Sequence, residues 1–154
     1  MALPADQPAL GFDLEEFLPY RLSVLSNRVS DAFARLYETR FGITIPEWRV
    51  IANVGRFGPI SANGVCERSA MDKVTVSRAV QRLVDKGFLD RRTDAHDRRR
   101  SSLTLSPAGA AIYAEIVPLA LQIQSALVAD LDEDERRALD LLMDKLDRRI
   151  AELP

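Results

Sequence analysis

The 154-residue sequence has little of what disulfides, metal centres and hydrolytic sites require, with one cysteine and one histidine. A single cysteine, Cys66, excludes a disulfide within the subunit, so we expect a reducing, cytoplasmic location. One histidine, His96, with scattered carboxylates predicts neither a metal site nor a cofactor. A Gly-rich phosphate loop and a serine–histidine–aspartate set on a plausible elbow are also missing, which argues against an enzyme.

Long hydrophobic runs are the next absence. We find no apolar run approaching the roughly 20 residues that a membrane-spanning helix needs, and we expect no membrane partner. Residues 1–13 are acidic and lack an apolar segment, which predicts no signal peptide. With 47% hydrophobic and 29% charged residues, the chain is instead typical of one soluble globular domain with its own core.

Charge is distributed unevenly along the chain, although the formal net charge is only −2. Residues 68–100 hold ten Lys or Arg against five Asp or Glu, a local balance of +5. Residues 130–154 hold nine acids against five bases. A basic segment on an acidic protein is the pattern of a DNA-facing module on a separate scaffold.

Residues 72–87 are predicted to form one helix with two unlike faces. At 100° per residue, one face is apolar and must be buried, and it carries Val76, Val80, Leu83 and Val84. The opposite face carries Val74, Ser77, Arg78 and Gln81, flanked by Thr75 and Arg82. Arginine pairs with guanine, glutamine with adenine, and a small apolar group with a thymine methyl, so this face suits base edges. The alternative is an ordinary amphipathic core helix with a solvated outer face.

Capping residues predict the helices around this one. Thr44 and Glu47 have capping-box spacing and start a helix that stops before Gly58. Ser61 caps a short helix over residues 62–69, and Asp72 caps the two-faced helix. Two short helices in tandem, the second with a polar recognition face, make a helix-turn-helix.

Two short β-prone stretches follow, over residues 88–92 and 102–106, and a basic loop joins them. A β-hairpin directly after a recognition helix is a wing. The predicted fold class is therefore mostly α with a small β-hairpin wing, a winged helix-turn-helix with N- and C-terminal dimerisation helices.

Long helices flank this unit. Periodic apolar residues predict one over residues 13–40, another over 107–128 that is kinked or restarted near Pro118, and a last one starting at Asp132. The winged unit is too small to bury their apolar faces. We therefore expect the terminal helices to pack on each other and on a second copy of the chain.

This organisation makes residues 1–154 one domain. Its winged lobe covers residues 44–106, and its dimerisation helices cover 13–41 and 107–152. A two-fold dimer would place two recognition helices ~34–36 Å apart, which matches the half-site spacing of a palindrome.

Three stretches carry a resemblance to a known family: residues 74–91, the triplet Asp97-Arg98-Arg99, and the run Leu103-Thr-Leu-Ser-Pro-Ala-Gly109. Together they resemble the MarR family of bacterial transcription regulators, and the similarity extends from the first long helix to the last. It implies a homodimeric repressor that binds a palindromic operator in double-stranded DNA. It also implies release by a small ligand, frequently aromatic or anionic, held between the dimerisation helices and the winged lobe.

The expected DNA-contact set is Ser61, Asn63, Lys73, Val74, Thr75, Ser77, Arg78, Gln81, Arg82, Asp97, Arg98 and Arg99. Of these, the resemblance carries over Thr75, Ser77, Arg78, Gln81 and Arg82 as the recognition-helix surface, and Asp97 and Arg99 as the wing pattern. Arg78 is the expected base reader. Lys73 and Arg82 are expected to clamp the DNA backbone. Ser61 and Asn63 are expected to donate to phosphate from the start of the preceding helix.

The wing residues match the family's Asp-x-Arg pattern. Arg99 would enter the minor groove, whose narrow electronegative floor attracts a guanidinium. Asp97 would either hold the wing by pairing with a nearby arginine such as Arg91 or Arg92, or be a solvated loop carboxylate. Arg98 would contact phosphate or face solvent.

The expected ligand-binding set is Tyr20, Arg21, Arg28 and Trp48. Arg21 and Arg28 either face solvent or the dimer partner, or they line a pocket and meet a carboxylate or phosphate. Trp48 is either core or stacks on an aromatic ligand, and Tyr20 is a similar case. The runs 20–30 and 46–50 are similar to a proteobacterial branch that senses aromatic acids and their acyl-CoA thioesters. An aromatic acid or its CoA ester is therefore the expected effector.

Two other functions stay open. Cys66 could make the regulator redox-responsive, although no second cysteine resolves a sulfenic acid within the subunit, and its other role is a small buried hydrophobe. The chain could also be a helical protein–protein adaptor whose basic wing docks an acidic partner. An adaptor would show no preference for a palindrome over random duplex.

Overall fold

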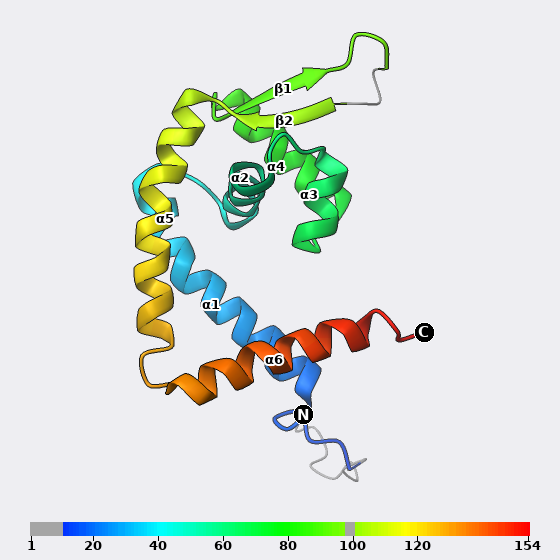
Figure 1. The fold of residues 1–154 in the computed structure, drawn as a ribbon, viewed down its shortest axis with the longest axis vertical. Coiled ribbons are helices and arrows are strands. Elements are labelled where there is room, and N and C mark those ends of the chain that lie inside the picture. The colour runs from blue at the N-terminus through cyan, green and yellow to red at the C-terminus, as the bar shows by residue number, and fades with distance from the viewer. Residues whose placement is uncertain (1–10, 98–100) are drawn as a thin grey trace, which may run out of the picture.

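The computed structural model describes residues 11–97 and 101–154. Within them the elements, in chain order, are α1 (Leu18–Phe41), α2 (Ile45–Phe57), α3 (Ala62–Ser69), α4 (Lys73–Asp85), β1 (Leu89–Thr93), β2 (Ser101–Leu105), α5 (Pro107–Leu127) and α6 (Glu133–Ile150). This is the predicted winged helix-turn-helix with flanking helices (Figure 1). The wing arginines predicted at 98 and 99 lie outside the described residues.

Helix α1 begins later than predicted. It starts at Leu18 rather than at Asp13, with Pro19 in its first turn and no side-chain cap from Phe17. Proline fits the first turn, where its missing N–H has no partner to lose, but its ring clashes in a helix interior. Pro19 therefore sets the start of the helix even though the apolar period continues upstream. The helix ends at Gly42, whose φ of 63° is left-handed.

The predicted caps of the winged lobe are all confirmed. Thr44 and Glu47 form a reciprocal capping box on α2, and Ser61 accepts the Gly64 amide at 3.0 Å on α3. The wing pairs antiparallel from Leu89 opposite Leu105 to Thr93 opposite Ser101, each strand within one residue of its predicted ends.

The core lies inside the lobe and at its junction with α1 and α5. Residues from α2, α3, α4 and both strands have exposures of 3% or less: Val50, Ile51, Val54, Val65, Val76, Ala79, Val80, Leu83, Leu89 and Leu103. Tyr37 of α1, Ile43 after it and Ile116 of α5 join the same cluster. The lobe therefore has one core that also holds the two adjoining helices.

Helix α5 is continuous through Pro118, so the restart predicted there is not found. A stretch of 18 residues within this 21-residue helix has a mean hydropathy of 1.3 and a largely uncovered surface, which corrects the expectation that no stretch is long and apolar enough to cross a membrane. Its first half is nevertheless built into the lobe, because Ile116 is fully buried there. Glu115 also pairs with Arg40 of α1 at 3.4 Å.

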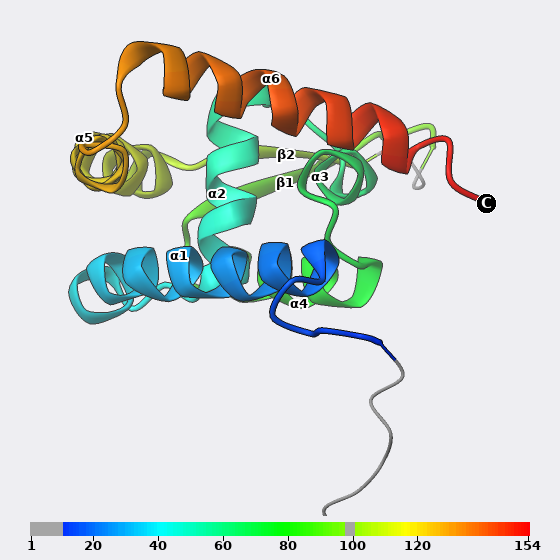
Figure 2. The ribbon, with the colours of Figure 1, turned by 90° about the horizontal axis from the view of Figure 1, so that it is seen from below.

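Helix α6 extends from the far end of α5, well away from the winged lobe (Figure 1). It runs on the opposite side of the molecule from α1 (Figure 2). None of its residues, all of which are described, is buried. Of the terminal helices, α1 and α5 do pack on each other, whereas α6 adds no buried residue to this packing, and the expected contact with a second copy stays a prediction.

Candidate nucleic-acid interface

Helix α4 separates its two faces as predicted. Its inner face is buried through Val76, Val80 and Leu83, each 0% exposed. Its outer residues Ser77, Arg78, Gln81 and Arg82 are exposed, as are Lys73 at its start and Val74 at 59%. Thr75 is half-buried at the edge. The result is a polar stripe with one apolar side chain, presented to solvent by a helix whose back is fixed in the core.

The first turn of α4 is held by Asp72. One carboxylate oxygen accepts the Thr75 amide at 2.8 Å, and the other accepts the Thr75 hydroxyl at 2.6 Å. The hydroxyl bond, followed by the amide bond, holds the pKa of Asp72 below its ordinary value of 3.8. Because the Thr75 hydroxyl already donates to Asp72, only its acceptor capacity remains for a base or phosphate.

Two other predicted contact residues have partners within their own helices. The Gln81 amide donates to Asp85 at 2.9 Å, and the Asn63 amide donates to Glu67 at 2.9 Å. All four side chains are exposed. Since exposed hydrogen bonds of this kind are weak net of solvent, either amide can turn to DNA at small cost.

Helix α3 packs against α4 in the helix-turn-helix. Ser61, its N-cap, uses its hydroxyl oxygen to accept from Gly64, so its O–H remains available to donate. At the other end of α3, the Arg68 guanidinium stacks 3.9 Å from the centroid of the Phe57 ring at the end of α2. This cation–π contact joins the end of α3 to the end of α2.

The wing adds further cations. Arg91 and Arg92 of β1 are exposed and lie opposite Leu103 and Ser102 of β2. Asp97, the first residue of the Asp-Arg-Arg triplet, is exposed and is the last described residue before position 98. Arg98 and Arg99 fall outside the described residues, so their predicted groove and phosphate contacts stay predictions.

The four predicted ligand residues divide into two places. Tyr20, Arg21 and Arg28 line one groove of about 620 Å³ along α1. Trp48 is not among its lining residues and stacks instead between Tyr37 and Tyr113, with ring centroids 5.9 and 6.3 Å away. Burial, with a smaller contribution from Glu38, raises the pKa of Tyr37 to about 12. The structure thus brings Tyr20, Arg21 and Arg28 together in one groove, and it places Trp48 with Tyr37 and Tyr113 where α1, α2 and α5 meet.

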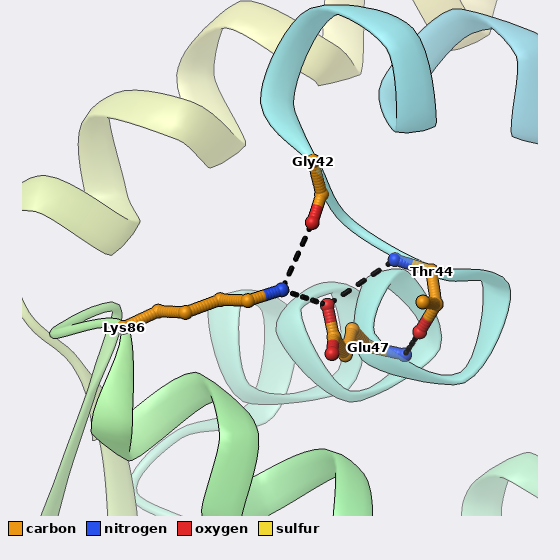
Figure 3. Close-up of polar contacts among 4 residues, drawn as sticks. All are labelled: Gly42, Thr44, Glu47 and Lys86. Atoms are coloured by element: carbon orange, nitrogen blue, oxygen red, sulfur yellow. Dashed lines mark hydrogen bonds and ion pairs between the residues drawn. The ribbon is translucent and has the colours of Figure 1, made fainter.

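Sequence reasoning missed a polar cluster where α1, α2 and α4 meet (Figure 3). Glu47 is 1% exposed, and its Oε2 lies 2.7 Å from Lys86 Nζ. Lys86 also donates to the Gly42 carbonyl at 2.9 Å. The sequence predicted Glu47 as a capping-box residue, but no local pattern indicates that it pairs with Lys86, 39 positions away.

Known proteins give the same picture. Residues 41–100 match a family model described as MarR family. A putative transcriptional regulatory protein for the hcr operon of Thauera aromatica is 27% identical over 122 residues, which cover 79% of this chain and 74% of that relative.

Two solved structures are similar over most of the chain. One describes regulation of DNA binding of Bordetella bronchiseptica BpsR by 6-hydroxynicotinic acid; it is 27% identical, with a TM-score of 0.78 over 88% of this chain and 96% of that chain. A MarR/EmrR family transcriptional regulator from Acinetobacter sp. ADP1 has a TM-score of 0.85 at 22% identity, over 92% of this chain and 100% of that chain.

The fold and the exposed stripe on α4 define a winged helix-turn-helix DNA-binding protein. The match over residues 41–100 is to the MarR family of transcription regulators, whose members are regulators rather than enzymes. The predicted resemblance is confirmed, and the protein is a DNA-binding transcription regulator of the MarR type.

Proposed function

We propose that this protein is a cytoplasmic, homodimeric repressor that binds a palindromic operator and is released by a small aromatic or anionic ligand. The single observation that supports DNA binding is the arrangement of the two faces of α4. Its apolar face is sealed in the core while Val74, Ser77, Arg78 and Gln81 face solvent. A helix fixed in this way can enter the major groove without moving its own core contacts.

Each exposed group has a proposed role in reading DNA. Arg78 reads guanine, Gln81 reads adenine, and Val74 contacts a thymine methyl. Ser77 accepts or donates beside them, and Thr75, whose hydroxyl already donates to Asp72, accepts. Lys73, Arg82, Ser61 and Asn63 contact the phosphate backbone and set the register. In the wing, Arg99 enters the minor groove, Asp97 holds the loop and Arg98 contacts phosphate.

Uncovered apolar side chains support the homodimer. They lie on α1, α5 and α6, and the largest include Leu25, Leu121, Leu142, Met143 and Ile150. Fully burying one such side chain is worth about 1.5–3 kcal/mol, so leaving them all in water is costly. A second copy that covers α6 with its own α1 and α6 would bury these faces and bring two recognition helices to one side of the assembly.

The groove on α1 supports a carboxylate ligand. Arg21 and Arg28 line it together with Tyr20 and the apolar side chains Leu22 and Leu25. Seven residues of helix rise separate the two arginines by about 10 Å, so one can hold a carboxylate while the groove between them holds a ring. The BpsR work concerns 6-hydroxynicotinic acid, an aromatic acid of this kind. An aromatic acid or its CoA thioester is the proposed effector.

The test is a fluorescence-anisotropy titration of the purified protein with duplex DNA from upstream of its own gene. Salt-sensitive, sequence-selective binding is expected, because displaced counterions scale with the phosphates contacted. 6-Hydroxynicotinic acid, other aromatic acids and their CoA thioesters are then added to the complex. Selective binding that none of them relieves would contradict the effector class but keep the DNA function. Equal affinity for that duplex and a scrambled one would favour the adaptor function.

A further inference from the structure

The Lys86 ammonium lies where three helix ends meet, at the joint between α1 and the winged lobe (Figure 3). It donates to the carbonyl of Gly42, the left-handed residue that ends α1. It also pairs with Glu47 in the first turn of α2. Lys86 itself is the C-cap residue of α4. One cation therefore connects the scaffold helix, the first helix of the lobe and the recognition helix.

The charges and dipoles at this joint favour a cation at residue 86. The Glu47 side chain is 2% exposed, and its Oε2 accepts from both the Thr44 amide at 3.2 Å and Lys86. A buried carboxylate needs such donors, because burying a charge without partners is unfavourable. The C-terminal carbonyls of α1 carry partial negative charge, which also favours a cation at this point. An apolar or acidic side chain at residue 86 would remove the donor to the Gly42 carbonyl and leave the Glu47 carboxylate with the Thr44 amide but without its cation.

We propose that Lys86 and Glu47 are positioning residues for operator binding. They close the joint at residues 42–44 and so fix the angle between α1 and the lobe that carries α4. In the homodimer, on which this inference rests, that angle sets the distance between the two recognition helices. The Lys86 ammonium and the Glu47 carboxylate face each other and the end of α1 (Figure 3), so they act through α4 and not by touching bases.

A loosened joint is expected to affect binding to a palindrome and to random duplex differently. A palindrome is bound by two recognition helices at once, and the second contact is made at the effective concentration that the scaffold provides. A loosened joint lowers that effective concentration for a correctly spaced operator. It leaves the contact of each lobe with random duplex unchanged.

Lys86→Met and Glu47→Gln test the joint. Glutamine still completes a capping box, so Glu47→Gln removes the charge while keeping the cap of α2, and it remains informative where Lys86→Met folds poorly. Lys73→Met is the matched contrast, since it removes a lysine from the exposed start of the same helix. Three duplexes serve as probes: the one that wild type selects from a random-sequence pool, the same duplex with one base pair inserted between its half-sites, and a scrambled one.

Anisotropy is measured over a salt series at a temperature where circular dichroism shows every variant folded. Lys86→Met and Glu47→Gln are expected to lower affinity for the selected duplex by about tenfold or more, and to reduce the preference over the inserted duplex. Affinity for the scrambled duplex and the salt slope should equal the wild-type values. Lys73→Met should weaken all three complexes and make the salt slope less steep by about one.

Hydrogen exchange without DNA gives the structural readout. Faster exchange is expected at residues 42–47 and in the last turn of α4, and unchanged exchange elsewhere in the lobe. Variants that keep wild-type affinity and spacing preference, that behave like Lys73→Met, or that exchange faster throughout the lobe would overturn the inference. A wild type that does not prefer the selected duplex over the scrambled one would contradict the proposed function itself, and the operator role of Lys86 with it.

Discussion

Gly109 lies against the main chain of Phe88 so closely that a Cβ on residue 109 would be 1.9 Å from the Phe88 carbonyl oxygen. Ser106, the N-cap of α5, completes this contact. Its hydroxyl donates to the Gly87 carbonyl at 2.6 Å and accepts the Gly109 amide at 3.0 Å. The Ser-Pro-x-Gly sequence therefore fastens α5 to the end of the recognition helix and the start of the wing.

Gly109→Ala is expected to destabilise the protein by about 2 kcal/mol or more, because the methyl group meets backbone that cannot rotate away. Urea denaturation measures the effect. Ala108→Ser is the matched control, since it adds one heavy atom at an exposed position in the same turn and should change stability by less than about 0.5 kcal/mol. Equal stability of Gly109→Ala and wild type would contradict this close packing.

Arg78→Ala is expected to cost ~1–3 kcal/mol on the operator and to relax base preference at one position, because its guanidinium is the proposed base reader. Competition anisotropy with single-base-substituted duplexes measures both quantities. Arg82→Ala, which removes a proposed backbone clamp, should weaken binding evenly over all sequences. The same even loss for Arg78→Ala would reassign Arg78 to phosphate.

Arg99→Ala is expected to weaken operator binding by about 2 kcal/mol while the dimer stays intact, because the wing guanidinium is proposed to lie in the minor groove. Anisotropy gives the affinity, and light scattering after size exclusion gives the mass. Arg149→Ala removes the same charge from α6 and should leave affinity unchanged. Unaltered operator affinity in Arg99→Ala would remove the wing assignment.

The cap of α4 predicts a pH dependence. Hydrogen bonds from the Thr75 hydroxyl and then its amide hold the pKa of Asp72 below 3.8 in the folded state. A depressed folded pKa contributes stability above the unfolded value, and this contribution is lost as pH falls through the folded pKa. Asp72→Asn keeps a capping side chain, so it should be less stable than wild type near neutral pH and approach it below pH 3.8.

Urea denaturation at a series of pH values, from neutral downward, measures this difference. Asp90→Asn, at an exposed position of β1, controls for the loss of one negative charge. A stability difference between Asp72→Asn and wild type that does not change with pH would mean that ionisation of Asp72 plays no part in the cap.

Local chemistry explains which features were predictable from the sequence. The caps at Thr44, Ser61 and Asp72 each bond to an amide three residues later, so the sequence contains the whole interaction. The two faces of α4 follow from helical period alone. The start of α1 was mispredicted because apolar period was given more weight than the restriction that Pro19 imposes.

Long-range relationships were not predictable in this way. Lys86 and Glu47 are 39 positions apart, and nothing in either local sequence specifies the other. Trp48 was left between core and ligand roles, and its stacking with Tyr37 and Tyr113 depends on how α1, α2 and α5 come together. An apolar stripe indicates that a face will be covered but not by which element, so the sequence did not show that α5 packs on α1 while α6 stays uncovered in the single chain.

The uncovered stripe of α6 predicts the effect of a charge in the proposed dimer interface. Met143 is 60% exposed in the single chain and lies on the stripe with Leu139 and Leu146, whereas Leu141 is 52% exposed on the opposite face. Met143→Asp is therefore expected to give a monomer by sedimentation, since burying an unpaired carboxylate in an apolar interface is strongly unfavourable. Leu141→Asp places the same charge on the same helix outside the stripe, and it should remain a dimer. A monomer in both variants would point to general damage to α6, and a dimer in both would exclude this stripe from the interface.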